Sequence, residues 1–359
     1  MKAKDRIVAG GKRGGRVDGA GARGQRQQHE QRKLHQDDGH MAKTLSAGRT
    51  RNAPVGIFFR LVEIALRVSP PASVSPSILH LRIERDAVLN TTERRMLDML
   101  KRGRDEFGVV AVKAEFEAEG TRPDEFLRLL HLARAADLKV ALKIGGCEAV
   151  SDLLASRLYG VDHIIAPMVE TPYALSKYIE AKGKTYSAEP LGTQFLFNLE
   201  TETTLRNLAA MLPLAVAGGL NGVVFGRVDF TLSRGLPRGA INHRDITDAV
   251  LIAAQACAHA GLELVVGGSV AVEAAPALRE IRRIRLDRFE TRKIVFDGAV
   301  AELPDFEAAI GNAVAFELAW LENKREHYAA IADEDLPRLR MMRERDASAS
   351  RRQMTSVAA

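Results

Sequence analysis

The feature that most constrains this chain is a regular alternation of short apolar runs and helix-like stretches between residues 91 and 300. Seven such units are clear, and their apolar runs are rich in Val, Ile and Leu. Short strands that alternate with helices indicate βα units around a parallel sheet. An eighth strand, for which residues 77–83 are the candidate, would close the sheet. The sequence therefore predicts an α/β protein, a (β/α)₈ TIM barrel with parallel strands.

The positions of the predicted elements follow from this alternation. The predicted strands cover residues 108–117, 139–146, 161–169, 193–200, 222–230, 262–270 and 288–296. The predicted helices cover residues 91–106, 123–136, 148–159, 171–183, 202–217, 245–260 and 271–280.

The two ends of the chain differ in composition from the barrel. Residues 1–53 hold 13 Lys/Arg and 5 Asp/Glu and almost nothing apolar, so we predict a disordered basic tail. The alternative interpretation is that this tail is an RNA-binding arm. Residues 54–90 are a poorly defined lead-in, and residues 91–300 form the barrel. Residues 301–359 are predicted to form C-terminal helices with one apolar face, from which we expect a homo-oligomer.

Composition limits the class of protein. The net charge of +6 comes from the basic tail, because the other 306 residues carry about −2. We therefore do not expect nucleic acid as a partner of the folded part. No run of about 18 uncharged apolar residues occurs, so we expect no membrane span. The two cysteines form no disulfide or metal pattern, and we expect a cytoplasmic protein.

Charged residues recur where the predicted strands stop. Glu200 and Asp229 are separated by about one βα repeat, which places both carboxylates at neighbouring strand ends facing one pocket. Hard cations such as Mg²⁺ or Mn²⁺ are commonly held by one or two carboxylates, with water and substrate as further ligands. The alternative is that Glu200 and Glu202 only favour the start of the next helix through its dipole.

Three motifs resemble the HpcH/HpaI aldolase and citrate lyase family. They are "GVDHIIAPMVETPYAL" (160–175), "FLFNLET" (195–201) and "GVVFGRVDFTLSRGLP" (222–237). The resemblance covers about residues 108–300. It implies a (β/α)₈ barrel, a divalent metal and the cleavage or formation of a carbon–carbon bond next to a carbonyl. Carried over to this chain, the metal ligands are Glu200 and Asp229.

The chain also departs from the family pattern. The family usually has Asp-x-Glu-His at its first conserved strand end, where the His is a general base, but this chain has "EFEAEG" with Ala118 at that place. The family's substrate-binding Arg corresponds to Lys143, which lacks the bidentate fork of Arg. Arg227 stands where the aldolases commonly have Pro. These differences indicate a divergent branch of the family.

The resulting expectation is a cytoplasmic, divalent-metal-dependent carbon–carbon lyase that acts on a 2-keto acid or a related carboxylate. Lys143 would place positive charge beside the developing enolate or pair structurally with Glu115 or Glu117. Glu117 or Glu115 would serve as base or position a water, and Arg292 would bind an anionic group or form a salt bridge. Two alternatives stay open: a citrate-lyase-like acyl-CoA lyase, and an inactive barrel that serves in binding or assembly.

Overall fold

The computed structural model describes residues 89–187 and 192–357, and for residues 352–357 it describes the backbone only. The predicted tail (1–53) and the candidate eighth strand (77–83) lie outside the described residues. The lead-in (54–90) does so too, apart from its last two residues.

Eight strands form a closed barrel in which each strand pairs with its neighbour along the chain, and the last pairs with the first. The strands are β1 (Val109–Glu115), β2 (Lys139–Lys143), β3 (His163–Ala166), β4 (Gln194–Leu199), β5 (Gly222–Gly226), β6 (Glu263–Gly267), β7 (Arg288–Glu290) and β8 (Ile294–Asp297). The closed eight-stranded barrel is confirmed. Strands β1 to β7 run parallel, as predicted.

The structure differs from the prediction in the strand that closes the barrel. Strand β8 runs antiparallel to both β7 and β1. The run 288–296, predicted as one strand, is a hairpin because its middle residues form a tight turn. In this turn the Thr291 N–H donates to Ile294 O at 2.9 Å, and the Ile294 N–H donates to Thr291 Oγ1 at 3.2 Å. Arg292 therefore lies in a turn at the barrel mouth.

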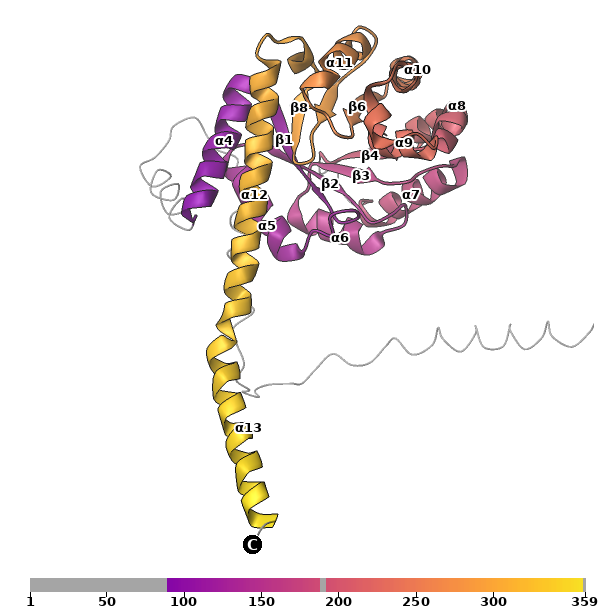
Figure 1. The fold of residues 1–359 in the computed structure, drawn as a ribbon. Coiled ribbons are helices and arrows are strands. Elements are labelled where there is room, and N and C mark those ends of the chain that lie inside the picture. Colours follow the sequence, from indigo (N-terminus) through magenta and orange to yellow (C-terminus); the bar gives the residue numbers. More distant parts are fainter. Residues whose placement is uncertain (1–88, 188–191, 358–359) are drawn as a thin grey trace, which may run out of the picture. The chain divides into compact units, whose positions relative to one another are not determined.

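Helices surround the barrel (Figure 1). They are α4 (Thr91–Phe107), α5 (Pro123–Ala135), α6 (Val150–Tyr159), α7 (Pro172–Thr185), α8 (Glu202–Ala217), α9 (Arg227–Ser233), α10 (Arg244–Ala260), α11 (Ala275–Arg282) and α12 (Phe306–Glu334), with 3₁₀ turns η1 (Arg238–Asn242), η2 (Val272–Ala274) and η3 (Gly298–Glu302). Helix α13 (Leu336–Val357) follows α12, and its residues 336–351 are exposed. Among the described residues, no helix is both long enough and apolar enough to cross a membrane.

One further difference affects the site. The strand predicted over residues 222–230 ends at Gly226, and α9 begins at Arg227. Beyond Gly226 the buried residues are Arg227, Phe230 and Thr231, a spacing of three and four that belongs to a helix and not to a strand. Asp229 therefore lies in the first turn of α9, not at the end of a strand.

The C-terminal helices are confirmed, and α12 lies along α4 (Figure 1). The contact is specific: the Asn312 amide donates to Met99 O at 3.1 Å, and the Asn90 amide donates to Asn323 Oδ1 at 2.8 Å. Four of the apolar residues expected to mediate association are instead buried in the core (Phe306, Ile310, Phe316, Trp320). Three remain exposed on α12 (Val314, Leu318, Leu321).

The barrel interior is layered. Every strand except β7 contributes one residue to a central apolar cluster (Ala111, Ala141, Ile165, Leu196, Val224, Val265, Val295). Because side chains alternate along a strand, the residues two positions away face the interior as well. Toward the carboxyl ends of the parallel strands these include Lys113 and Lys143, and toward the amino ends they include His163 and Glu263. The apolar layer thus separates a polar mouth from a polar bottom.

Candidate functional site

The mouth of the barrel is a cavity of about 540 Å³. Ten charged side chains line it: Lys113, Lys143, Arg238 and Arg292 with positive charge, and Glu115, Glu117, Glu200, Asp229, Glu290 and Glu317 with negative charge. The structure therefore brings all six predicted site residues to one cavity. Four cations against six carboxylates leave a formal charge of −2, which favours a cationic ligand.

Glu200 follows β4 directly and is almost fully buried. Its Oε1 accepts from the Met168 N–H at 2.9 Å, and its Oε2 accepts from the Asn198 amide at 2.6 Å. A Cβ on Gly226 would lie 3.0 Å from Glu200 Cβ and 3.1 Å from its Oε2. A glycine on the neighbouring strand therefore makes room for this carboxylate. The apolar run ends in Glu200 because the residue turns into the mouth, where specific donors hold it.

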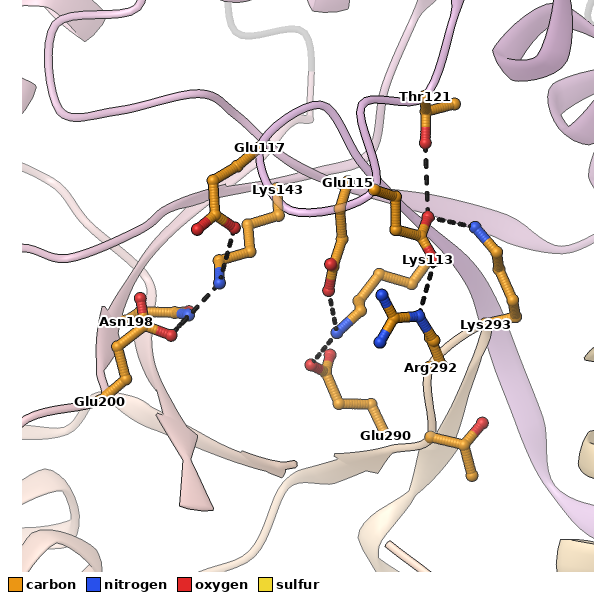
Figure 2. Close-up of polar contacts among 12 residues, drawn as sticks. Lys113, Glu115, Glu117, Thr121, Lys143, Asn198, Glu200, Glu290, Arg292 and Lys293 are labelled. Carbon is orange, nitrogen blue, oxygen red and sulfur yellow. Dashed lines mark hydrogen bonds and ion pairs between the residues drawn. The ribbon is translucent and has the colours of Figure 1, made fainter. Parts of the chain in front are cut away.

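Lys143, at the end of β2, connects two carboxylates (Figure 2). Its Nζ lies 3.0 Å from Glu117 Oε2 and 3.2 Å from Glu200 Oε2. Burial alone would lower the pKa of Lys143, but the Glu200 and Glu117 carboxylates outweigh it and raise the pKa. Lys143 is therefore a fixed cation. Of the pairings expected from the sequence, the one with Glu117 is present, whereas Glu115 pairs elsewhere.

A second charged cluster, centred on Lys113, was not identified from the sequence. Lys113 Nζ lies 2.5 Å from Glu290 Oε1 and 3.1 Å from Glu115 Oε1 (Figure 2). Burial opposes its charge, but Glu290 and Glu115 raise its pKa well above the usual range. A Cβ on Gly267 would lie 2.8 Å from Glu290 Oε1. The sequence signal that could have identified this cluster is the spacing of two between Lys113 and Glu115 in β1, which directs both charged side chains into the barrel.

Asp229 lines the mouth from the first turn of α9 and is half-buried. Burial raises its pKa, and the negative charge of Glu200 raises it further, against an opposing effect of Lys143. Within the described chain, the Asp229 carboxylate makes no hydrogen bond or ion pair. Two carboxylates that repel each other in one cavity are the arrangement that a bound cation relieves.

Arg292 lies on the rim of the cavity, with a half-exposed side chain. Its Nε donates to Glu119 Oε1 at 3.0 Å, and Lys293 pairs with the same carboxylate (Figure 2). The structure therefore contains the salt bridge that was the alternative reading of Arg292, although its partner is Glu119. The guanidinium still faces the cavity, so a role in binding stays a prediction.

Arg227 is almost fully buried, which its place in the sequence did not indicate. Its guanidinium donates to Gly267 O, Gly268 O and Asn242 Oδ1 at 3.3, 3.0 and 3.0 Å. Burial lowers its pKa to about 10. Arg227 therefore remains a cation at neutral pH. Within the described residues, it has no carboxylate at ion-pair distance.

Three further residues take no part in these ion pairs: Ala118, His243 and Cys147. Ala118, at the place of the family's His, lines the cavity and brings no titrating group. His243 is exposed and is absent from the cavity wall, so it does not replace that His. Cys147 is half-buried, and burial raises the pKa of its thiol, which disfavours the thiolate.

The donor set suits a hard dication. The described residues contain no group of three or more His, Cys, Asp or Glu side chains arranged to hold a metal. Mg²⁺ needs fewer, since it is usually bound through one or two carboxylates with water and substrate. Glu200 and Asp229 supply two carboxylates. Asn198 Oδ1 adds a buried amide oxygen without a hydrogen-bond partner among the described residues. These residues fit such a cation, and Lys143 competes with it for Glu200.

No protein-family model matches the chain, and a comparison with curated proteins finds no match. Among solved structures, an HpcH/HpaI aldolase from Desulfitobacterium hafniense DCB-2 is 14% identical over 53% of this chain and 78% of its own, with a TM-score of 0.41. An HpcH/HpaI aldolase/citrate lyase family protein from Burkholderia cenocepacia J2315 is 13% identical over 66% and 98%, with a TM-score of 0.43.

RipC from Yersinia pestis is 16% identical over 58% of this chain and 87% of its own, with a TM-score of 0.39. Two of these three structures carry the name of the family that the motifs of this chain resemble.

Proposed function

We propose that this chain is a divalent-metal-dependent carbon–carbon lyase whose substrate is a 2-keto acid or a related carboxylate. The observation that carries the proposal is the mouth cavity, which has a formal charge of −2 and is lined by both Glu200 and Asp229, close enough for the charge of Glu200 to raise the pKa of Asp229. The three sequence motifs that resemble the aldolase and citrate lyase family include both residues.

Glu200 and Asp229 would hold Mg²⁺ or Mn²⁺, and the buried Asn198 Oδ1, which has no hydrogen-bond partner among the described residues, is a further candidate ligand. When bound, such an ion supplies Lewis acidity to the carboxylate and keto oxygens of the substrate, which is worth several kcal/mol in reactions of this kind. Asn198 and the Met168 N–H orient the Glu200 carboxylate, since each donates a hydrogen bond to one of its oxygens.

Lys143 would keep positive charge next to the carbon chain of the substrate as negative charge develops there. Its raised pKa keeps the amine protonated, so it acts as a cation and not as a Schiff-base nucleophile, which needs the neutral amine. Glu117 or Glu115 would act as the base and accept the proton that the substrate loses when its carbon–carbon bond is cleaved. Burial would raise the pKa of Glu115, but Lys113 lowers it, so this carboxylate is ionised and able to act as a base.

The test is a screen of aldol adducts of pyruvate with the full-length chain and Mn²⁺ or Mg²⁺, in which released pyruvate is measured by NADH-coupled reduction. We expect activity that disappears with EDTA and in Glu200→Gln. The matched control is Glu202→Gln, because Glu202 pairs with Arg206 at the protein surface and does not line the cavity. Pyruvate release that survives EDTA would contradict the metal-dependent reaction. Release from CoA esters alone would favour the acyl-CoA lyase.

A further inference from the structure

The end of β6 and the loop after it, residues 267–270, have no role in the proposed reaction, yet their backbone is unusual. Gly268 and Ser269 both have a left-handed backbone, with φ of 87° and 48°. A Cβ on Gly268 would lie 2.7 Å from Val228 N, so only glycine fits there. Residues 268–270 line the mouth cavity. A non-glycine residue held at positive φ in a cavity wall is a strained arrangement of the kind that clusters at functional sites.

Arg227 fixes the orientation of this loop from behind. Its guanidinium donates hydrogen bonds to three successive carbonyl oxygens: those of Gly267 at 3.3 Å, Gly268 at 3.0 Å and Ser269 at 3.5 Å. All three oxygens are thereby directed to one side. The backbone N–H groups of Ser269 and Val270 donate no hydrogen bond to any other described residue. The loop therefore keeps free donors at the cavity.

The charge of Arg227 needs a counter-ion that the described chain does not supply. Its side chain is buried, with 2% of the residue exposed, and its partners are neutral oxygens. Buried charges in proteins are normally paired, because desolvation without a partner is costly. An anion bound at the loop would provide the missing negative charge across a single layer of backbone.

Arg238 provides a second guanidinium on the open side of the loop. It lies in η1, is exposed, and lines the cavity together with Ser269. Its Nη2 donates to Ser269 Oγ at 3.2 Å, and within the described residues no carboxylate lies at ion-pair distance. Two arginines, one buried and one exposed, therefore flank the same four residues.

We propose that residues 268–270 and Arg238 form a binding site for an oxyanion, a phosphate or carboxylate group that the substrate carries away from its reacting carbons. Guanidinium and backbone N–H groups are the usual donors to such groups. The loop follows β6, and Asp229 follows the adjacent β5, so one ligand can reach both. The assignment to the lyase substrate rests on the proposed function, whereas the anion site itself does not.

The test is calorimetric titration of the full-length chain with inorganic phosphate and, separately, with acetate, in EDTA and without turnover. We expect one anion per chain. Arg238→Ala should weaken binding about tenfold or more, since a hydrogen bond to a charged group is lost. The matched control is Arg234→Ala, because Arg234 is an exposed arginine of the same segment that does not line the cavity. It should bind like the wild type.

Each outcome decides the proposal. Binding of phosphate alone supports it and identifies a phosphorylated substrate, whereas binding of acetate alone supports it and identifies a second carboxylate. Binding of neither anion overturns it, as does equal weakening in Arg238→Ala and Arg234→Ala. Because no metal ion or substrate is present, a negative result in the lyase screen leaves this titration interpretable.

Discussion

Charged side chains in the barrel interior are buried at the mouth (Lys113, Lys143, Glu200) and half-buried at the bottom (Arg288, Glu263), but only one end pairs all of those described below. At the bottom, Arg288 pairs with Glu263 and donates to Gln194 Oε1 at 3.3 Å, and its Nη1 lies 2.9 Å from His163 Nε2. Gln194 in turn donates to Glu263 Oε1 at 3.4 Å. Each of these four side chains therefore has a partner of the right kind.

At the mouth, several groups lack such a partner. Asp229 faces the like charge of Glu200, Asn198 Oδ1 is buried without a hydrogen bond among the described residues, and Arg227 is a buried cation bonded only to neutral oxygens. Removal of charge from solvent is therefore not itself a sign of function. The mouth differs because some of its polar and charged groups have no suitable partner among the described residues, and a bound ligand can supply one.

The largest effect is expected at the proposed metal ligands. Glu200→Gln and Asp229→Asn each remove a negative charge with little change in size, so we expect each to abolish Mn²⁺ binding and lyase activity while the fold survives. The double variant should be little worse than either single one, because residues that act as a unit are not additive. Calorimetric titration of Mn²⁺ checks this. Wild-type-like binding in either single variant would remove the metal site from the mouth.

At the bottom, the expected effect is on stability and depends on pH. Burial, together with the positive charges of Arg288 and Lys139, lowers the pKa of His163 to about 3. In the folded state His163 therefore stays neutral at pH values at which it takes up a proton in the unfolded state. The contribution of neutral His163 to stability is fully present above its unfolded pKa of 6.5 and is lost as the pH falls toward about 3. The slope is at most about 1.4 kcal/mol per pH unit.

His163→Gln removes this titration but keeps a group that can accept a hydrogen bond from Arg288. We expect the loss of stability between pH 6.5 and about 3 to become shallower in this variant, as measured by urea unfolding at several pH values. His243→Gln is the control, because His243 is exposed. A wild-type slope in His163→Gln would show that His163 is not held neutral, and a loss of Mn²⁺ binding would break the separation of the two ends.

Sequence patterns predicted the barrel well because burial repeats along the chain. Helix α8 (Glu202–Ala217) has the predicted bounds, and β4 differs by one residue at each end. The errors arose where the period changes within one apolar run. Asp229 was assigned to a strand because Val and Phe precede and follow it, although the burial of Arg227 and Phe230 is helical. The turn at Thr291 was hidden in a similar way by residues that favour strands.

The sequence could predict the site residues that lie at strand ends. It could not predict the ion pairs and hydrogen bonds that join residues from different strands. Glu200 and Lys143 follow apolar runs, so the sequence places both at the mouth. That Lys113 lies 2.5 Å from Glu290 Oε1 depends on closure of the barrel, which joins residues 177 positions apart. The burial of Arg227 depends equally on carbonyl groups of another strand end, and no local spacing reports such a contact.

A smaller effect should reveal how Lys143 and the metal share Glu200. Lys143→Met leaves Glu117 and Glu200 without their cation and makes the formal charge of the cavity −3. We expect a loss of about 3 kcal/mol of unfolding free energy without metal, as for other broken buried pairs. Mn²⁺ should then raise the melting temperature more than in the wild type, because ligand binding stabilises the folded state.

The control for this experiment is Lys139→Met, which removes an exposed lysine from the opposite end of the same strand. It should change neither the stability without metal by more than about 0.5 kcal/mol nor the response to Mn²⁺. If both variants respond to Mn²⁺ alike, the ion does not compete with Lys143, and the difference between the two ends loses one of its supports.

The smallest effect on the fold is expected at the surface beside the mouth. Val314, Leu318 and Leu321 of α12 are 56%, 57% and 53% exposed, and Val314 also lines the mouth cavity. Their spacing of four and three places them on one face of the helix, and such an apolar face indicates association between copies of the chain. Leu318→Glu should therefore convert an oligomer to a monomer with little change in melting temperature, as measured by light scattering at micromolar concentration. Leu158→Glu is the control, because Leu158 is 69% exposed on α6. A monomeric wild type would refute the association, and it would leave the barrel mouth as a site that a single chain completes by itself.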